Sequence, residues 1–121
     1  MTSFAVLIEG PVLQGQSFVS ALRFMQQAVV AGHSVDLVFL YRDAVYAASA
    51  LIDLPSDEPK LSARLQQFCL QHQIPLLFCI TAAEKRGVCS DEVKPAHGYT
   101  AAGLAEFAMR LANTDKLVQF S

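Results

Sequence analysis

Apolar and polar residues along this chain alternate between two kinds of segment. Short, nearly continuous apolar runs occupy residues 3–9, 35–41, 75–80 and 116–120. Such runs are typical of strands that are buried on both faces of a parallel sheet. Between the runs, apolar residues recur every three or four positions, as in amphipathic helices that pack on a sheet. The pattern therefore predicts strands that alternate with helices.

The clearest helical segment lies between the first two runs. Its apolar stripe extends from Phe18 to Val29, with Ser17 as the expected N-cap and Gly32 just beyond the expected end. Together with the two flanking runs, this segment predicts a β-α-β unit.

Later segments repeat the alternation. Residues 43–52 and 61–69 carry two more helical stripes, which a polar break separates. After the third apolar run we expect a short helix, a loop rich in Gly, Pro and charge, and a last helix that Thr100 caps and whose apolar stripe is Leu104, Phe107, Ala108 and Leu111. This order predicts an α/β fold, a three-layer sandwich with a mostly parallel, flavodoxin-like sheet, in a single domain over residues 1–121.

Composition adds expectations about partners and location. Hydrophobic residues make up 53% of the chain and charged residues 17%, below the roughly 25% usual in soluble domains. We therefore expect other subunits of an oligomer to cover part of the surface. The nine Lys and Arg residues are scattered and the net charge is -2, which argues against direct binding of nucleic acid. No apolar stretch approaches the roughly 18 residues of a membrane span, and the first residues lack a basic leader, so we expect a cytoplasmic protein without membrane contact.

The cysteine at the end of the third apolar run is the main candidate for chemistry. Sites in open parallel sheets lie beyond the carboxyl ends of the strands, where Cys79 is expected. Thr81 and Glu84 match the S/T-x-x-E capping box of a helix start. The positive end of that helix, with Lys85 and Arg86 in the same segment, would favour an ionised sulfur. The alternative is that Cys79 is a small buried hydrophobe in a strand.

The other two cysteines have weaker claims to chemistry. Cys69 lies on the apolar stripe of its helix, which favours core packing. Cys89 is expected in an exposed loop, where it is either a bystander or a second thiol that resolves a disulfide or persulfide on Cys79. A zinc site made of Cys79, Cys89 and His97 lacks the usual close ligand pairs, so we expect no metal.

The loop over residues 10–16 offers an alternative site. It contains two glycines after the first strand but neither the GxGxxG nor the GxxxxGK[ST] pattern. A flavodoxin-like module that binds a small anion or nucleotide there therefore stays an open alternative, beside the simpler reading of a turn into the first helix.

Several motifs occur in an order and spacing that resemble the DsrE-like sulfur-relay family over nearly the whole chain. They include "EGP" after the first strand, "AGH" before the second, "VFLYRDAVYAA" and "SDE". The most specific is "CITAAEKRGV", which is similar to the family pattern Cys-x-Ala-Ala-Ala-x-x-Arg-Gly-(Val/Ile). "GYTAAGLAEFA" and "DKLVQF" resemble the last helix and strand of the family.

The resemblance implies that Cys79 accepts a sulfane sulfur as a persulfide and passes it to the next thiol, without a cofactor. It implies a TusA-like donor, a TusE-like acceptor, TusB- and TusC-like sister subunits, and a relay that ends in 2-thiolation of the tRNA wobble uridine. The chain differs from the family pattern in three places. Thr81 replaces an alanine, Cys89 replaces an aliphatic residue, and the loop over residues 91–97 is several residues shorter.

Two further functions within the same family stay open. One is a non-catalytic subunit that completes the interface of an oligomer, and the other is a relay that serves sulfur oxidation. The leading hypothesis is a sulfurtransferase in which Cys79 carries the sulfur. Thr81 and Glu84 would organise the helix start, and Lys85 and Arg86 would give electrostatic support.

Overall fold

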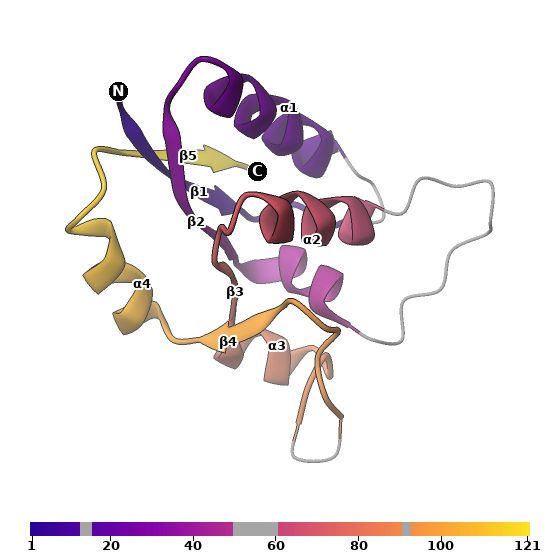
Figure 1. Ribbon diagram of the computed structural model, residues 1–121. Coiled ribbons are helices and arrows are strands. Elements are labelled where there is room, and N and C mark those ends of the chain that lie inside the picture. The colour runs from indigo at the N-terminus through magenta and orange to yellow at the C-terminus, as the bar shows by residue number, and fades with distance from the viewer. Residues whose placement is uncertain (13–15, 50–60, 91–92) are drawn as a thin grey trace.

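Five parallel strands form one sheet with helices on both of its faces (Figure 1). The computed structural model describes residues 1–12, 16–49, 61–90 and 93–121. The strand order is β4-β3-β2-β1-β5, and every neighbouring pair is parallel. The predicted α/β class and parallel sheet are therefore confirmed. Along the chain the elements are β1 (Ser3–Ile8), α1 (Gln16–Val30), β2 (Ser34–Leu40), the 3-10 helix η1 (Arg42–Ala48), α2 (Leu61–Gln71), β3 (Leu76–Cys79), α3 (Ile80–Lys85), β4 (Thr100–Ala102), α4 (Leu104–Leu111) and β5 (Lys116–Phe120).

Two aromatic contacts show which helix covers which face of the sheet. Phe4 of β1 packs edge-on against Phe24 of α1, with ring centroids 5.1 Å apart. Phe39 of β2 stacks on Phe107 of α4 at 4.4 Å. Leu7 of β1 pairs with Phe39 in the ladder and lies three residues after Phe4, so Phe4 and Phe39 point to opposite faces. Helices α1 and α4 therefore form the outer layers of a three-layer sandwich.

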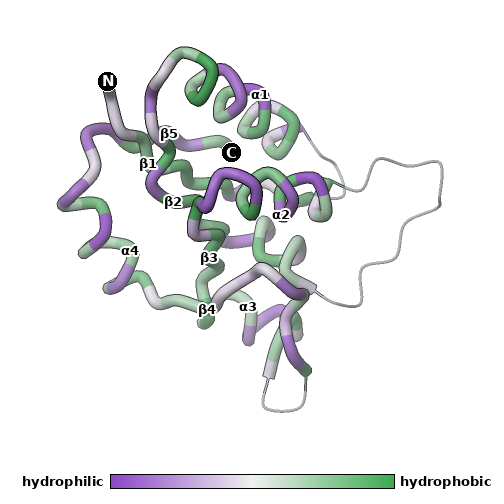
Figure 2. Tube along the Cα trace, in the orientation of Figure 1, coloured by the Kyte–Doolittle hydropathy of each residue, from purple (hydrophilic) through white to green (hydrophobic). Residues whose placement is uncertain are grey.

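The central strands are buried on both faces, as continuous apolar runs require. All four residues of β3 are buried, and so are the last four of β2. Figure 2 shows the strands largely hydrophobic, whereas α2 and α4 alternate between hydrophobic and hydrophilic positions. The edge strand β5 has three exposed residues and two half-buried ones. The core therefore lies over β1, β2 and β3, and the β5 edge is open.

Helix starts were predicted less well than strands. Helix α1 begins at Gln16, so Ser17 lies inside the first turn and the prediction that it is the N-cap is wrong. The predicted end is confirmed, because Gly32 has φ +87 and its amide bonds to the Val29 carbonyl at 3.1 Å. The helix expected over 43–52 is a 3-10 helix as far as Ala48, and residues 50–60 lie outside the described part of the chain.

Thr100 was expected to cap the last helix, and this prediction is wrong. Residues Thr100–Ala102 form β4, which pairs with β3, and Gly103 stands at the N-cap of α4 without a side-chain capping bond. The pairing with β3 holds Thr100 in extended conformation.

In the described ranges, no helix is both long enough and apolar enough to cross a membrane.

Candidate active site

Cys79 ends β3 and is also the N-cap of α3, because the strand runs into the helix without a connecting loop. In the ladder it pairs with Ala102 of β4. This places the thiol at the carboxyl edge of the sheet, where parallel α/β folds carry their sites. Only 2% of Cys79 is exposed. Cys79 is therefore buried like a core residue, but it lies at the carboxyl edge of the sheet, where parallel α/β folds carry their sites.

A cavity of roughly 360 Å³ lies against Cys79. Segments that are far apart in the sequence form its walls: the end of β2 with the start of η1, the helix α3, and the first residue of α4. The thiol is thus nearly closed to bulk water but borders a hollow that a small group can enter. The lining residues are Tyr41, Arg42, Cys79, Thr81, Ala82, Lys85, Arg86 and Leu104.

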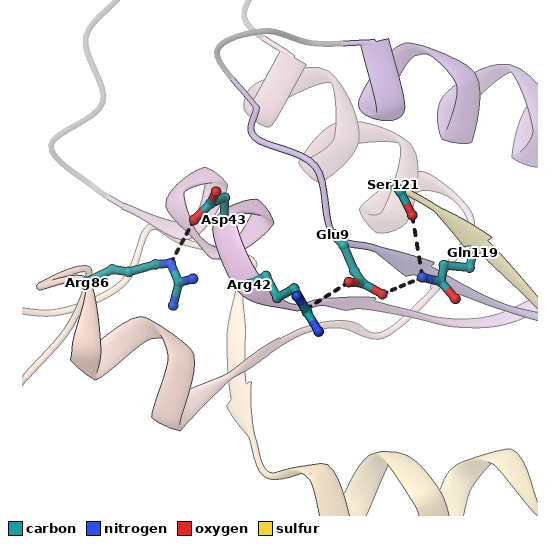
Figure 3. A network of polar contacts seen from close by, with 6 residues as sticks. All are labelled: Glu9, Arg42, Asp43, Arg86, Gln119 and Ser121. Atoms are coloured by element: carbon teal, nitrogen blue, oxygen red, sulfur yellow. Dashed lines mark hydrogen bonds and ion pairs between the residues drawn. The ribbon is translucent and has the colours of Figure 1, made fainter.

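Arg42 is fixed at the cavity by a chain of polar contacts (Figure 3). Its Nε lies 3.0 Å from Oε2 of Glu9, which follows β1. The other Glu9 oxygen accepts a hydrogen bond from Nε2 of Gln119 in β5, which also donates to Ser121 Oγ at 3.4 Å. These contacts tie the carboxyl ends of β5, β1 and β2 together. They also orient a cation that lines the same cavity as Cys79.

Arg86 is held by a second set of contacts, which connects α3 to η1. Its Nε lies 3.0 Å from Oδ1 of Asp43, as Figure 3 also shows, and its Nη1 donates to the carbonyl of Ala82 at 3.2 Å. Exposed ion pairs of this kind contribute about 0–1 kcal/mol to stability, so the contact matters more for orientation than for folding. Arg42 begins η1 shortly after β2, whereas Arg86 is the C-cap of α3.

The predicted capping box of Thr81 and Glu84 is not formed. Because α3 begins at Ile80, Thr81 already lies in the first turn, and the N-cap Cys79 has no side-chain capping bond. Thr81 and Glu84 are both exposed. Of the residues predicted to support Cys79, the structure brings Thr81, Lys85 and Arg86 to the cavity, whereas Glu84 is not one of the lining residues.

Cys89 was expected in an exposed loop, and it is buried, with 6% exposure. The chain turns back after α3, where the Val88 amide bonds to the Ala83 carbonyl at 2.9 Å, and this turn takes Val88 and Cys89 inward. Burial raises the pKa of the Cys89 thiol, and the negative charge of Glu84 raises it further. Cys89 is therefore poorly suited to act as an exposed second thiol.

Cys69 packs in the core as predicted, and its burial raises the pKa of the thiol to about 12. All three cysteines are free. His97 is exposed, its carbonyl accepts a hydrogen bond from Gln66, and it does not line the cavity. Within the described ranges, no group of three or more His, Cys, Asp and Glu side chains is arranged to hold a metal ion.

The alternative site in the loop over residues 10–16 is only partly described, since residues 13–15 lie outside the described ranges. Close packing against α1 explains why the first residue of this loop, Gly10, is a glycine. A Cβ atom at Gly10 would lie 2.1 Å from Oγ of Ser17, so the absence of a side chain lets α1 approach the end of β1.

Sequence reasoning missed four lining residues, Tyr41, Arg42, Ala82 and Leu104. Tyr41 and Arg42 follow β2, which is the neighbour of β3, and residues after adjacent parallel strands meet at one edge of the sheet. That rule would have found them. Leu104 arrives through the crossover from β4 to β5, and no local pattern indicates it.

Comparisons with known proteins agree with this architecture. The family model of the DsrE/DsrF-like family matches residues 2–120. The chain is 32% identical over 126 aligned positions to a protein of Aliivibrio fischeri named "Sulfurtransferase TusD homolog", covering 97% of each. The crystal structure of the ychN protein from E. coli superposes with a TM-score of 0.81 at 20% identity, over 99% of this chain and 100% of that one. The resemblance expected from the motifs is confirmed: this chain belongs to the DsrE/DsrF-like family.

Proposed function

We propose that the protein is a sulfurtransferase subunit that accepts a sulfane sulfur on Cys79 as a persulfide and passes it to another thiol. The observation that carries the proposal is the placement of Cys79 at the carboxyl end of β3, against a cavity lined by Arg42, Lys85 and Arg86. The name of the Aliivibrio fischeri relative supports the same class of reaction.

The transfer needs only an ionised sulfur and a donor that can reach it. The Cys79 thiolate attacks the outer sulfur of a donor persulfide R–S–SH, and a new S–S bond forms as the donor bond breaks. The donor leaves as the thiolate R–S⁻, the proton stays on the outer sulfur, and no oxidant or cofactor takes part. Because an S–S bond is about 2 Å long, the outer sulfur on Cys79 would extend from the buried thiol into the cavity. Transfer to the acceptor repeats the same exchange.

Partners are proposed on the same basis. We place the subunit between a TusA-like donor and a TusE-like acceptor in the cytoplasm, with TusB- and TusC-like sister subunits, in a relay toward 2-thiolation of the tRNA wobble uridine. Exposed apolar residues on α4 and β5 support burial of that side in an oligomer: Leu104 is 51% exposed, Met109 73% and Leu117 46%. A relay in sulfur oxidation would use the same chemistry with a different acceptor.

The test is to load the protein with sulfur and locate the added mass. Incubation with glutathione persulfide should add 32 Da, about one sulfur atom, to the peptide that contains Cys79, and Cys79→Ala should abolish it. Cys89→Ser is the matched control, because Cys89 does not line the cavity and should not be needed for loading. Unchanged loading of Cys79→Ala would remove the proposal, and a strong loss in Cys89→Ser would make Cys89 part of the reaction.

A non-catalytic interface subunit is the second candidate, and the burial of Cys79 favours it. A thiol that is 2% exposed can be packing material. An unreactive Cys79 in the fully assembled oligomer, tested by loading and by alkylation, would decide for this candidate.

A further inference from the structure

The cavity beside Cys79 carries more positive than negative charge. Its described lining residues include Arg42, Lys85 and Arg86, and none of them is acidic. The carboxylates that pair with the two arginines, Glu9 and Asp43, are not among these lining residues. A group that enters the cavity therefore meets cations, whereas the carboxylates hold the arginines from outside it.

The three cations differ in how much of their binding capacity is already used. Arg86 uses Nε for Asp43 and Nη1 for the Ala82 carbonyl, so its main role is to fasten α3. Arg42 uses Nε for Glu9, and its terminal nitrogens form no hydrogen bond or ion pair with another residue in the described ranges. Lys85 is exposed and forms no ion pair with another described residue. Arg42 and Lys85 are thus the cations available to a ligand.

The backbone conformation of Arg42 is a second indication that this residue has a functional role. Its φ of +53 lies in the left-handed region, which non-glycine residues seldom adopt and which costs about 1 kcal/mol or more. Residues held in such conformations by surrounding contacts cluster at functional sites. The Tyr41 amide donates to the Ile8 carbonyl at 3.0 Å and the Tyr41 carbonyl accepts from the Ala44 amide at 3.1 Å, which fixes the backbone next to Arg42, and the ion pair with Glu9 orients its side chain.

We infer that the cavity is an anion site in which Arg42 and Lys85 bind a carboxylate or oxyanion that the sulfur donor carries beside its transferable sulfur. This inference rests on the proposed sulfur transfer at Cys79. A volume of roughly 360 Å³ is near the lower end for ligand sites, so it fits a small charged group better than a large cofactor. The donor also leaves as a thiolate, and the cations that bind its anion stabilise this developing charge.

A matched pair of alkylating reagents tests the charge preference without any donor. Iodoacetate is anionic and iodoacetamide is neutral, and otherwise they react with thiols in the same way. The rate of each at Cys79 is measured by peptide mass mapping, and the ratio of the two rates is compared with the ratio for free cysteine. We expect the ratio at Cys79 to exceed that of free cysteine by about three- to tenfold and to fall in high salt.

Charge-removing variants identify the residues responsible. Arg42→Gln and Lys85→Gln should each lower the ratio toward that of free cysteine, and Arg42→Lys should keep most of it because the charge remains. Arg64→Gln is the control, since Arg64 is an exposed cation on α2 that does not line the cavity. A ratio equal to that of free cysteine in the wild type, or one that Arg64→Gln lowers equally, would overturn the inference.

Two pairs of sulfur donors identify where the anion comes from. Glutathione persulfide is compared with the persulfide of its diethyl ester, and a peptide persulfide flanked by aspartates is compared with one flanked by asparagines. Faster loading by glutathione persulfide than by its diethyl ester indicates that the anion belongs to a small-molecule donor. Faster loading by the aspartate-flanked peptide than by the asparagine-flanked one indicates that it belongs to an acidic segment of a donor protein. Equal rates within both pairs would overturn the inference even if Cys79 loads normally. If Cys79 does not load at all, the proposed function fails, and the alkylation ratio still decides whether the anion site exists.

Discussion

Replacing Phe107 by alanine should loosen α4 and open the cavity. Phe107 is the one buried residue in α4, a helix that the structure describes in full. Its ring lies parallel to that of Phe39, with an interplanar angle of 8° and centroids 4.4 Å apart. Leu104, one turn earlier on the same helix, lines the cavity beside Cys79. The attachment of α4 through Phe107 therefore determines how closed the cavity is.

The size of the effect follows from the burial of the ring. Truncation of a buried phenylalanine to alanine commonly costs about 3–5 kcal/mol, of which a stacked aromatic partner supplies about 1 kcal/mol. Phe107 is 8% exposed and lies on a short helix that can relax, so we expect the lower end of that range. With a urea m-value of about 1.5 kcal/mol/M, a loss of about 3 kcal/mol lowers the unfolding midpoint by about 2 M.

Two measurements on one set of variants test this. Urea unfolding followed by circular dichroism gives the midpoint, and alkylation of Cys79 by iodoacetamide in the absence of urea reports the opening of the cavity. Phe107→Ala should lower the midpoint and speed alkylation of Cys79. Met109→Ala is the matched control on the same helix, because Met109 is 73% exposed and its truncation should change the free energy of unfolding by less than about 0.5 kcal/mol.

The outcomes separate two kinds of opening. Faster alkylation without a lower midpoint would mean that α4 detaches locally while the sheet stays folded, which contradicts the assumption that α4 unfolds with the core. If Phe107→Ala resembles Met109→Ala in both measurements, the stack on Phe39 does not hold α4, and the reasoning is refuted.

Two further predictions concern the loop after β1 and the loss of stability at low pH. Gly10→Ala should lower the free energy of unfolding by about 1–3 kcal/mol, because the new Cβ would lie 2.1 Å from Ser17 Oγ. Thermal melting should show partial recovery when Ser17→Gly is added, and equal melting of the single and double variants would contradict the clash. Hydrogen bonds from Ser3 hold the pKa of Asp115 below its ordinary value of 3.8. The stability that this carboxylate contributes is thus present above about pH 4 and is lost as the pH falls. Asp115→Asn should therefore lower the melting temperature at pH 7 and leave it unchanged near pH 2, whereas an equal loss at both pH values would refute the linkage.

The elements that the sequence predicted well are those whose environment imposes a simple pattern. Strand β3 and the last four residues of β2 are buried on both faces, so these positions have to be apolar, and the runs at 35–41 and 75–80 show this directly. Strand β4 has three residues, two of them exposed, and it is a strand only because it pairs with β3. A short edge strand of this kind has no pattern of its own to detect.

Errors at the site have one cause in common, which is that the backbone path overrides the structure that the residue types suggest. Thr81 and Glu84 fit a capping box in sequence, but β3 passes directly into α3, and the helix start lies two residues earlier than that box requires. The loop with Cys89 looks exposed because it is rich in glycine and charge, yet a backbone bond from Val88 to Ala83 turns it into the core. Neither the early helix start nor the inward turn is marked by the residue types alone.

Burial and reactivity are compatible at Cys79 because they concern different sides of the residue. The strand neighbours enclose its backbone and most of its side chain, which leaves 2% exposure, and the cavity lies on the remaining side. A thiol in this position is screened from reagents that cannot enter a hollow of roughly 360 Å³. A donor that places a sulfur in the hollow meets Arg42 and Lys85 at the same time. In the sulfur transfer that we propose, the enclosure that makes Cys79 resemble packing material would therefore also let the site select its donor by shape and charge before any S–S bond is exchanged.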